Sequence, residues 1–102
     1  MVGGATGAQP TGPVLGPAFP NPFNAEVMIP FRLAAGAWVE LVVVDALGRP
    51  VRRLLAGRQP AGESAVRWDG HDGAGAAVAS GVYLVWLRAG AETGVTRVVL
   101  VR

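Results

Sequence analysis

Cysteine is absent from the 102 residues of the sequence, which excludes disulfide bonds, thiolate metal sites and cysteine nucleophiles. Lysine is also absent, so all nine basic residues are arginine, a bias that we attribute to the source of the sequence. The arginines are interleaved with seven acidic residues, and the net charge is only +2. A charge balance this close to neutrality gives no reason to expect nucleic acid as a partner.

Long hydrophobic runs are missing as well. The uncharged run from Gly73 to Leu87 is too short for a membrane span and is broken by glycines. The N-terminus has no basic residue ahead of an apolar segment, so it does not match a secretory signal. We therefore expect no transmembrane segment, and we expect any export signal to lie upstream, with this chain as the tail of a longer protein.

No window of the sequence repeats its apolar residues with a helical period. Instead, 15 glycines and eight prolines separate short apolar segments, and the hydrophobic fraction of 51% is ample for one core. Six or seven short strands joined by tight turns, over roughly 85 residues, predict an all-β protein built as an antiparallel β-sandwich.

A β-hairpin is predicted over residues 39–54. Its second strand starts at Pro50, which cannot donate to a ladder and therefore indicates an edge strand or a strand start. Before it, the Asp45 carboxylate can accept from backbone N–H groups two or three residues on, and Gly48 is free to adopt a positive φ. This is the chemistry of a type I turn closed by a left-handed residue with a bulge. The residues assigned to the inner face are Val39, Leu41, Val43, Val51 and Leu54.

Four further segments alternate apolar and polar residues and are predicted as strands: 27–33, 63–68, 81–88 and 94–102. In the first of them Pro30 falls on the outward face, which indicates an edge strand. Residues 56–62 are rich in turn formers and are predicted as a connection. Trp68 and Tyr83 are predicted as the centre of the core. The other inward residues are Val27, Ile29, Phe31, Leu33, Ser64, Val66, Val85, Leu87, Val98 and Leu100.

The folded domain is predicted to occupy residues 17–102. Residues 1–16 have hardly any large side chain, so they cannot bury enough surface to offset their ordering entropy, and we interpret them as a flexible linker. Three prolines then hold an extended lead-in, in which Phe19 and Phe23 are predicted to dock onto the domain.

Candidate catalytic and metal-binding groups are few. His71, the only histidine, lies between Asp69 and Asp72, and a triad with Ser64 or Ser80 lacks any feature that would fix its geometry. The two aspartates also lack the third acid and the closing glutamate of a calcium loop. A loop with Asx turns is the simpler interpretation. We expect no catalytic, cofactor or metal site, and no enzymatic activity.

Two other patterns have simple structural interpretations. The glycines between residues 70 and 81 follow no strand that leads into a helix, and no Gly-Lys-Ser/Thr sequence accompanies them, so we interpret them as turn glycines rather than a phosphate loop. Arg49, Arg52 and Arg53 form the one arginine cluster, and we interpret it as a solvated strand face rather than a phosphate-binding patch.

Trp38 and Trp86 fall on the parity opposite to the predicted core, beside Val42, Val44 and Leu84. Two interpretations are open. In the first, the sandwich is buried on both faces or the strand parity has been assigned wrongly. In the second, these side chains form an exposed apolar patch that contacts a passenger domain or a transport component.

Several short motifs occur in a fixed order: Pro20-Asn-Pro-Phe-Asn24, Asp45-x-x-Gly-Arg-x-Val51, Val66-x-Trp-Asp-Gly70, Ala79-Ser-Gly-Val-Tyr83 and a terminal strand from Arg97 to Arg102. Over about residues 15–102 this pattern resembles the type A C-terminal sorting domains, which direct bacterial surface proteins through the type IX secretion system. It also resembles the immunoglobulin-like domain of the flagellar hook-capping protein. Both resemblances imply an immunoglobulin-like antiparallel β-sandwich of about seven short strands.

The resemblance to sorting domains implies a non-enzymatic module, without cofactors, that directs a larger secreted protein to the cell surface. The implied partners are components of the secretion translocon and an upstream passenger domain, with attachment of the cargo to surface lipopolysaccharide after a sortase-like peptidase removes the domain. Carried over onto matching positions, the recognition motif comprises Asn21, Pro22, Phe23, Asp45, Gly48, Gly81, Tyr83, Arg97 and Arg102.

A second function stays open. The chain is alternatively a structural or adhesive immunoglobulin-like sandwich, accessory to an extracellular enzyme or to flagellar hook assembly. No helical or coiled-coil hook-assembly region accompanies it in this sequence.

Overall fold

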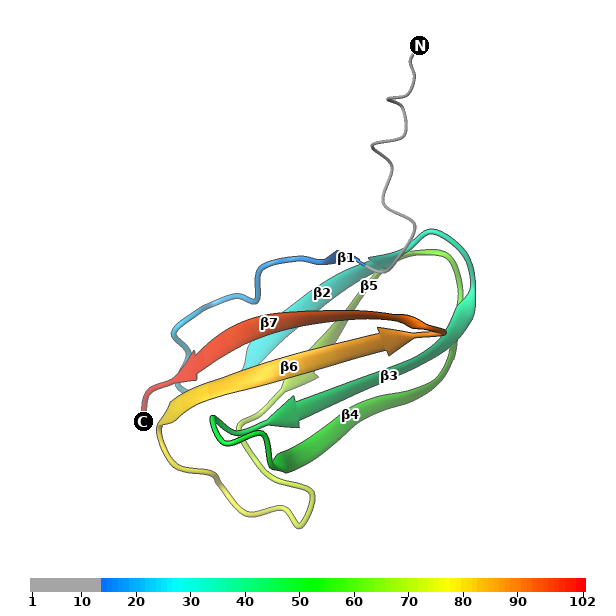
Figure 1. Cartoon of the computed structure of the whole chain (residues 1–102). Helices are drawn as coiled ribbons and strands as arrows, with labels where there is room; N and C mark the ends of the chain where they lie inside the picture. Colours follow the sequence, from blue (N-terminus) through cyan, green and yellow to red (C-terminus); the bar gives the residue numbers. More distant parts are fainter. Residues whose placement is uncertain (1–13) are drawn as a thin grey trace.

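The computed structural model describes residues 14–102, and these form two antiparallel sheets packed face to face (Figure 1). One sheet has the order β1-β2-β5 and the other the order β4-β3-β6-β7. The predicted all-β sandwich of about seven strands is therefore confirmed. The strands are β1 (Val14–Leu15), β2 (Val27–Leu33), β3 (Ala37–Val44), β4 (Pro50–Gln59), β5 (Gly62–Trp68), β6 (Gly81–Ala89) and β7 (Glu92–Leu100).

The core lies between the sheets and follows the period-two pattern of the sequence. In β2, β3, β6 and β7, every residue assigned to an inward face is buried, because alternate side chains of a strand point to the same side. Trp68 is fully buried, with its ring centroid 5.6 Å from that of Phe23 and 5.3 Å from that of Tyr83. These tilted and edge-on contacts are the favoured geometries for aromatic pairs. The predicted core centre is confirmed.

The β3–β4 hairpin has a less regular second strand than predicted. The ladder has two register shifts, and each leaves one residue of β4 without a partner in β3. Leu41 and Val42 pair with Leu55 and Arg53, so Leu54 is skipped. Val51 is skipped in the same way at the second shift. Bulges of this kind explain how Val51 and Leu54, three residues apart, both pack partly buried against the core. Pro50 begins β4, and β4 is an edge strand, as predicted.

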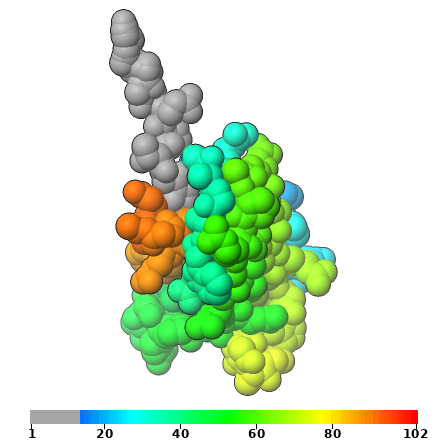
Figure 2. Space-filling view, turned by 90° about the vertical axis from the view of Figure 1, so that its right-hand side faces the viewer, coloured from blue at the N-terminus to red at the C-terminus, as the bar shows by residue number. Residues whose placement is uncertain are grey.

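The predicted connection over residues 56–62 is wrong in its first part. β4 continues to Gln59, since residues 56–59 pair with the start of β3, and only Pro60 and Ala61 separate β4 from β5. Glycine and arginine in this stretch are compatible with a strand when a neighbouring strand supplies the ladder, and local composition does not reveal that partner. Figure 2 shows the end of the sandwich where this connection lies near the β2–β3 and β6–β7 turns.

The prediction that Pro30 marks an edge strand is also wrong. β2 is the middle strand of its sheet, between β1 and β5. On the β1 side the Pro30 carbonyl accepts from the Gly16 N–H at 2.9 Å, and the proline has no N–H to offer in return. The ladder tolerates this because β1 is only two residues long. Val14 and Leu15, assigned to the linker, therefore form the first strand, whereas residues 1–13 of that linker lie outside the described residues.

Replacing Trp68 with alanine should destabilise the domain by about 3–5 kcal/mol, because it removes the side chain that contacts both aromatic neighbours and leaves a cavity between the sheets. Urea unfolding followed by far-UV circular dichroism measures the change. The matched control is Trp38→Ala on the exposed face, which should cost no more than about 0.5 kcal/mol. Equal losses for the two variants would contradict this account of the core.

Candidate functional site

The nine residues predicted as a recognition motif lie in two neighbouring regions. Asn21, Pro22, Phe23, Gly81, Tyr83, Arg97 and Arg102 surround the C-terminal half of β7. Asp45 and Gly48 form the β3–β4 turn, which lies at the end of the sandwich where the C-terminus emerges (Figure 1). Each region is best understood from the contacts that its residues make.

The segment Asn21–Phe23 is bound along the outer edge of β7. The Asn21 side chain donates from Nδ2 to the Arg97 carbonyl at 3.0 Å and accepts at Oδ1 from the Val99 N–H at 2.9 Å. The Phe23 N–H then donates to the Val99 carbonyl, and the Phe23 carbonyl accepts from the Val101 N–H. The lead-in thus satisfies backbone groups that an edge strand would otherwise expose to pairing with another chain. Phe23 itself is buried against Trp68.

Asp45 organises the β3–β4 turn as predicted. Its Oδ1 accepts from the N–H groups of Leu47 and Arg49, both at 2.9 Å, and its Oδ2 accepts from the Arg49 guanidinium. The Gly48 N–H closes the turn on the Asp45 carbonyl, with Gly48 at a φ of 84°. The hydrogen bond from the Arg49 backbone N–H is the main reason that the pKa of Asp45 lies below its usual value of 3.8.

Tyr83 and Gly81 belong to the start of β6. The Tyr83 hydroxyl donates to the Ala79 carbonyl at 2.6 Å, four residues upstream, while the ring packs edge-on against Trp68. This is the arrangement called a tyrosine corner in immunoglobulin-like sandwiches. Gly81 pairs with Leu100 in the β6–β7 ladder. Both residues therefore hold the β5–β6 loop and the C-terminal strand in place.

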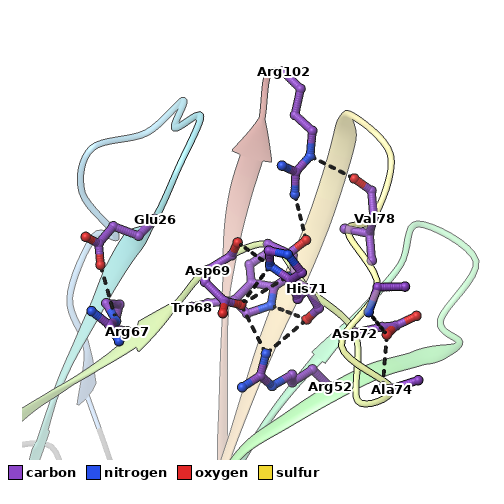
Figure 3. A network of polar contacts seen from close by, with 12 residues as sticks. Glu26, Arg52, Arg67, Trp68, Asp69, His71, Asp72, Ala74, Val78 and Arg102 are labelled. Atoms are coloured by element: carbon purple, nitrogen blue, oxygen red, sulfur yellow. Dashed lines mark hydrogen bonds and ion pairs between the residues drawn. The ribbon is translucent and has the colours of Figure 1, made fainter.

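Arg102 joins the C-terminus to the β5–β6 loop (Figure 3). Its guanidinium donates to the Gly70 carbonyl at 2.7 Å and to the Val78 carbonyl at 3.0 Å. The backbone N–H of Arg102 donates to the Ser80 hydroxyl. Gly70 has a φ of 74°, and a Cβ there would lie 2.6 Å from the Arg102 guanidinium. Glycine is favoured at position 70 because of this left-handed φ, and a Cβ there would also displace the Arg102 guanidinium from its present place.

The Asp69–Asp72 stretch forms a loop held by its own side chains (Figure 3). Asp69 accepts from the His71 N–H and the Arg52 guanidinium, while Asp72 accepts from the N–H groups of Ala74 and Ala76. The Trp68 indole N–H donates to the His71 carbonyl at 2.9 Å. The predicted Asx turns are confirmed.

The electrostatics of this loop are set by its own hydrogen bonds and by Arg52. Partial burial acts to raise the pKa of Asp69, but the His71 N–H and the Arg52 charge together bring it below its usual value. Within residues 14–102, no group of three or more histidine, cysteine, aspartate or glutamate side chains could hold a metal ion. The described part of the chain also has no helix long and apolar enough to cross a bilayer.

The arginine cluster is a set of ion pairs at the surface. Arg49 pairs with Asp45, Arg52 with Asp69 at 3.0 Å, and Arg53 with Glu40 at 3.3 Å. Each guanidinium thus has its own carboxylate, which makes it a poor site for phosphate.

Trp38 and Trp86 are exposed, with 58% and 44% of their surfaces accessible, so the predicted exposed apolar patch is present and the sheet is not covered on this face. Its contact with a passenger domain or a transport component stays a prediction. The two tryptophans lie on the outer face of the four-stranded sheet, which we call the tryptophan face. In cross-strand register, Trp86 lies between Val42 and Val95. The apolar residues of this face include Trp38, Val42, Val44, Val82, Leu84, Trp86, Val95 and Val99.

Two further residues of this face, Arg58 and Arg88, were not predicted from the sequence as part of it. They stand opposite Trp38 and Glu40 in the ladders, so they project outward with them. The parity of β6 already implied this for Arg88. Arg58 lies in the stretch that was predicted as a turn, where parity has no meaning.

Replacing Asn21 with alanine should destabilise the domain by about 1–3 kcal/mol, because two hydrogen bonds to β7 are lost. Amide hydrogen exchange should increase at Val99, whose N–H loses its acceptor, and remain slow in β3. The matched control is Asn24→Ala, since Asn24 is exposed like Asn21 but its side chain makes neither of these bonds to β7. Unchanged exchange at Val99 in the Asn21 variant would show that the edge is not held by this side chain.

Replacing Asp45 with asparagine should make the domain less sensitive to acid. Because the folded-state pKa of Asp45 is lowered, its charge stabilises the fold above the unfolded pKa, and this contribution is lost as the pH falls through the folded pKa. Asparagine keeps an oxygen for the two N–H groups but does not titrate. The melting temperature of the variant should therefore fall less than that of wild type below about pH 4. A normal Asp45 pKa in an NMR titration would refute this.

Structural comparison finds similar domains in two larger proteins. PorZ, described as an essential bacterial surface component of the type-IX secretion system of Porphyromonas gingivalis, gives a TM-score of 0.57 at 24% identity over 86% of this chain and 11% of that chain. Dimeric latent PorU from the same organism gives 0.67 at 18% identity over 93% of this chain and 10% of that chain. At these identities the similarity shows the fold, and this chain spans only about a tenth of either protein.

Comparison with curated protein sequences found no match. A model of the FlgD Ig-like domain family, by contrast, matches residues 22–92, which include β2 to β6 and most of the loops described above. On this match over more than half of its length, the chain belongs to the FlgD Ig-like domain family.

Proposed function

We propose that this domain is a non-enzymatic sorting or anchoring module that directs a larger secreted protein through the type IX secretion system to the cell surface. The observation that carries the proposal is its structural similarity to domains of PorZ and PorU, because the first is described as a surface component of that system. The order of the short motifs, which resembles type A sorting domains, supports the same conclusion.

The absence of enzymatic activity is part of the proposal. The polar groups of the one acidic loop are occupied in holding the backbone, since Asp69 and Asp72 accept from N–H groups of their own loop. The side chains of Asn21, Tyr83 and Arg102 are likewise engaged with backbone atoms. What this domain offers to a partner is therefore its sheet faces and edges rather than a reactive cleft.

The proposed partners are components of the secretion translocon and an upstream passenger domain. Attachment of the cargo to surface lipopolysaccharide, after the domain has been removed, completes the proposed route. In this scheme the motif residues around β7 and the β3–β4 turn act by giving the C-terminal strand and its loops one fixed shape. A translocon would recognise that shape through contacts with exposed side chains such as Arg97.

A reporter fusion tests the proposal. The full chain is fused behind a signal peptide and a fluorescent passenger and produced in a host with this secretion system and in a mutant that lacks the translocon. The passenger should become accessible to external protease only in the first host. A passenger retained in the periplasm of both hosts would count against sorting. Asn24→Ala should sort as wild type, and Trp68→Ala, which disrupts the core, should not.

A structural or adhesive role is the second candidate, and the exposed tryptophans favour it. Trp38 and Trp86 present aromatic rings on a sheet face, and such rings give large contact areas to a ligand or a neighbouring domain. Binding to a glycan array that is lost in Trp86→Ala, together with failure of the reporter test, would favour adhesion. Membership of the FlgD Ig-like domain family is equally compatible with a structural part in hook assembly.

A further inference from the structure

We propose that the tryptophan face is a docking surface for a partner protein segment in which acidic side chains flank apolar ones. This inference deepens the proposed function and rests on it only for the biological role of the contact.

Five of the arginines have a carboxylate partner in the structure. Besides the three pairs of the arginine cluster, Arg32 pairs with Glu63 and Arg67 with Glu26. Arg102 donates instead to two loop carbonyls. Within residues 14–102, this leaves three arginines whose guanidinium makes neither an ion pair nor a hydrogen bond to another residue, and all three are exposed: Arg58, Arg88 and Arg97.

The three unpaired arginines come from three strands but share one face. Arg58 in β4 is opposite Trp38 and Arg97 in β7 is opposite Leu84, while Arg88 in β6 is opposite Glu40. Since residues that pair across an antiparallel ladder point to the same side, all three guanidinium groups project from the tryptophan face. Glu40 is the one acid on this face, and Arg53 already binds it.

The apolar part of the face lies between these charges. Leu84, Trp86 and Arg88 succeed one another on the outward side of β6, and Val95 on β7 stands beside Trp86. Four of the exposed large hydrophobic residues of the domain belong to this face: Trp38, Val82, Trp86 and Val95. A shallow hollow beside Trp86 is lined by Glu40, Val42, Arg88 and Thr93. Exposed tryptophans framed by arginine are the composition expected of a protein-binding surface.

The charge of the face defines the chemistry of the partner. Guanidinium groups bind carboxylates through paired hydrogen bonds, and the apolar centre between them requires an apolar counterpart. A second copy of this domain is disfavoured, because it would bring an equally cationic face against this one. A polyanion such as nucleic acid would satisfy the arginines but not the aliphatic side chains Val82, Leu84 and Val95. An acidic and apolar protein segment satisfies both.

NMR titration of the full chain with a short synthetic peptide of alternating glutamate and leucine tests the inference. The indole N–H signals of the three tryptophans, assigned with Trp→Phe variants, are the readout. Trp38 and Trp86 should shift, and Trp68, whose indole is bound to the His71 carbonyl inside the core, should not. The same peptide with lysine in place of glutamate should give no shift, and added salt should weaken the binding of the acidic peptide.

Charge variants locate the site. Arg88→Gln combined with Arg97→Gln should weaken the acidic peptide at least about tenfold, because two charge-assisted contacts are lost. The matched control is Arg67→Gln on the other sheet, which should bind as wild type. Circular dichroism verifies that all variants are folded.

Several outcomes would overturn the inference: no shift at Trp38 and Trp86, equal shifts with the lysine peptide, or tighter binding of heparin or single-stranded DNA at the same signals. Dimerisation of the free chain through this face, seen by analytical ultracentrifugation, would also overturn it. The test is independent of secretion. A reporter that is sorted normally without peptide binding would remove only this inference, whereas peptide binding without sorting would remove only the proposed function.

Discussion

The burial of Trp68 is the interaction on which the rest of the domain depends. Its ring lies between Phe23 of the lead-in and Tyr83 of β6, so one side chain connects three separate parts of the chain. Its indole N–H is satisfied by the His71 carbonyl, which lets a tryptophan be fully buried without an unpaired donor. That bond also fixes the start of the β5–β6 loop, to which Arg102 binds from the other side. The packing of the core and the conformation of this loop therefore depend on each other.

The motif residues contribute to the same structure rather than to a reactive site. Asn21 binds along β7, Asp45 closes the β3–β4 turn, and the Tyr83 hydroxyl holds the β5–β6 loop. In each case the partners of the side chain are mainly backbone N–H or C=O groups. This use of polar side chains protects an edge strand and defines the loops at one end of the sandwich. The exposed side chains of the tryptophan face have no such structural partners, and it is to them that we assign the proposed partner contacts.

The sequence was informative wherever one residue could be interpreted by its own chemistry. Alternation placed the inner residues of β2, β3, β6 and β7, and the Asp45 and Gly48 pair defined the turn. It failed where the outcome depended on a partner strand. Pro30 indicates an edge only if no short strand lies beside it, and residues 56–59 become strand only because the start of β3 is available to pair with them. A ladder is a property of two segments, and single-segment patterns do not show it.

By itself, the sequence determined the all-β class, the inner face of most strands and the aromatic centre of the core, because period-two alternation and side-chain size act locally. The tertiary structure alone decided which arginines find carboxylates. Arg52 and Arg88 both lie in apolar strand segments, yet Arg52 pairs with Asp69, whereas Arg88 stands opposite Glu40, whose carboxylate pairs with Arg53 instead. Ion pairing depends on distances in space between residues far apart in sequence, and only the packed sheets set those distances.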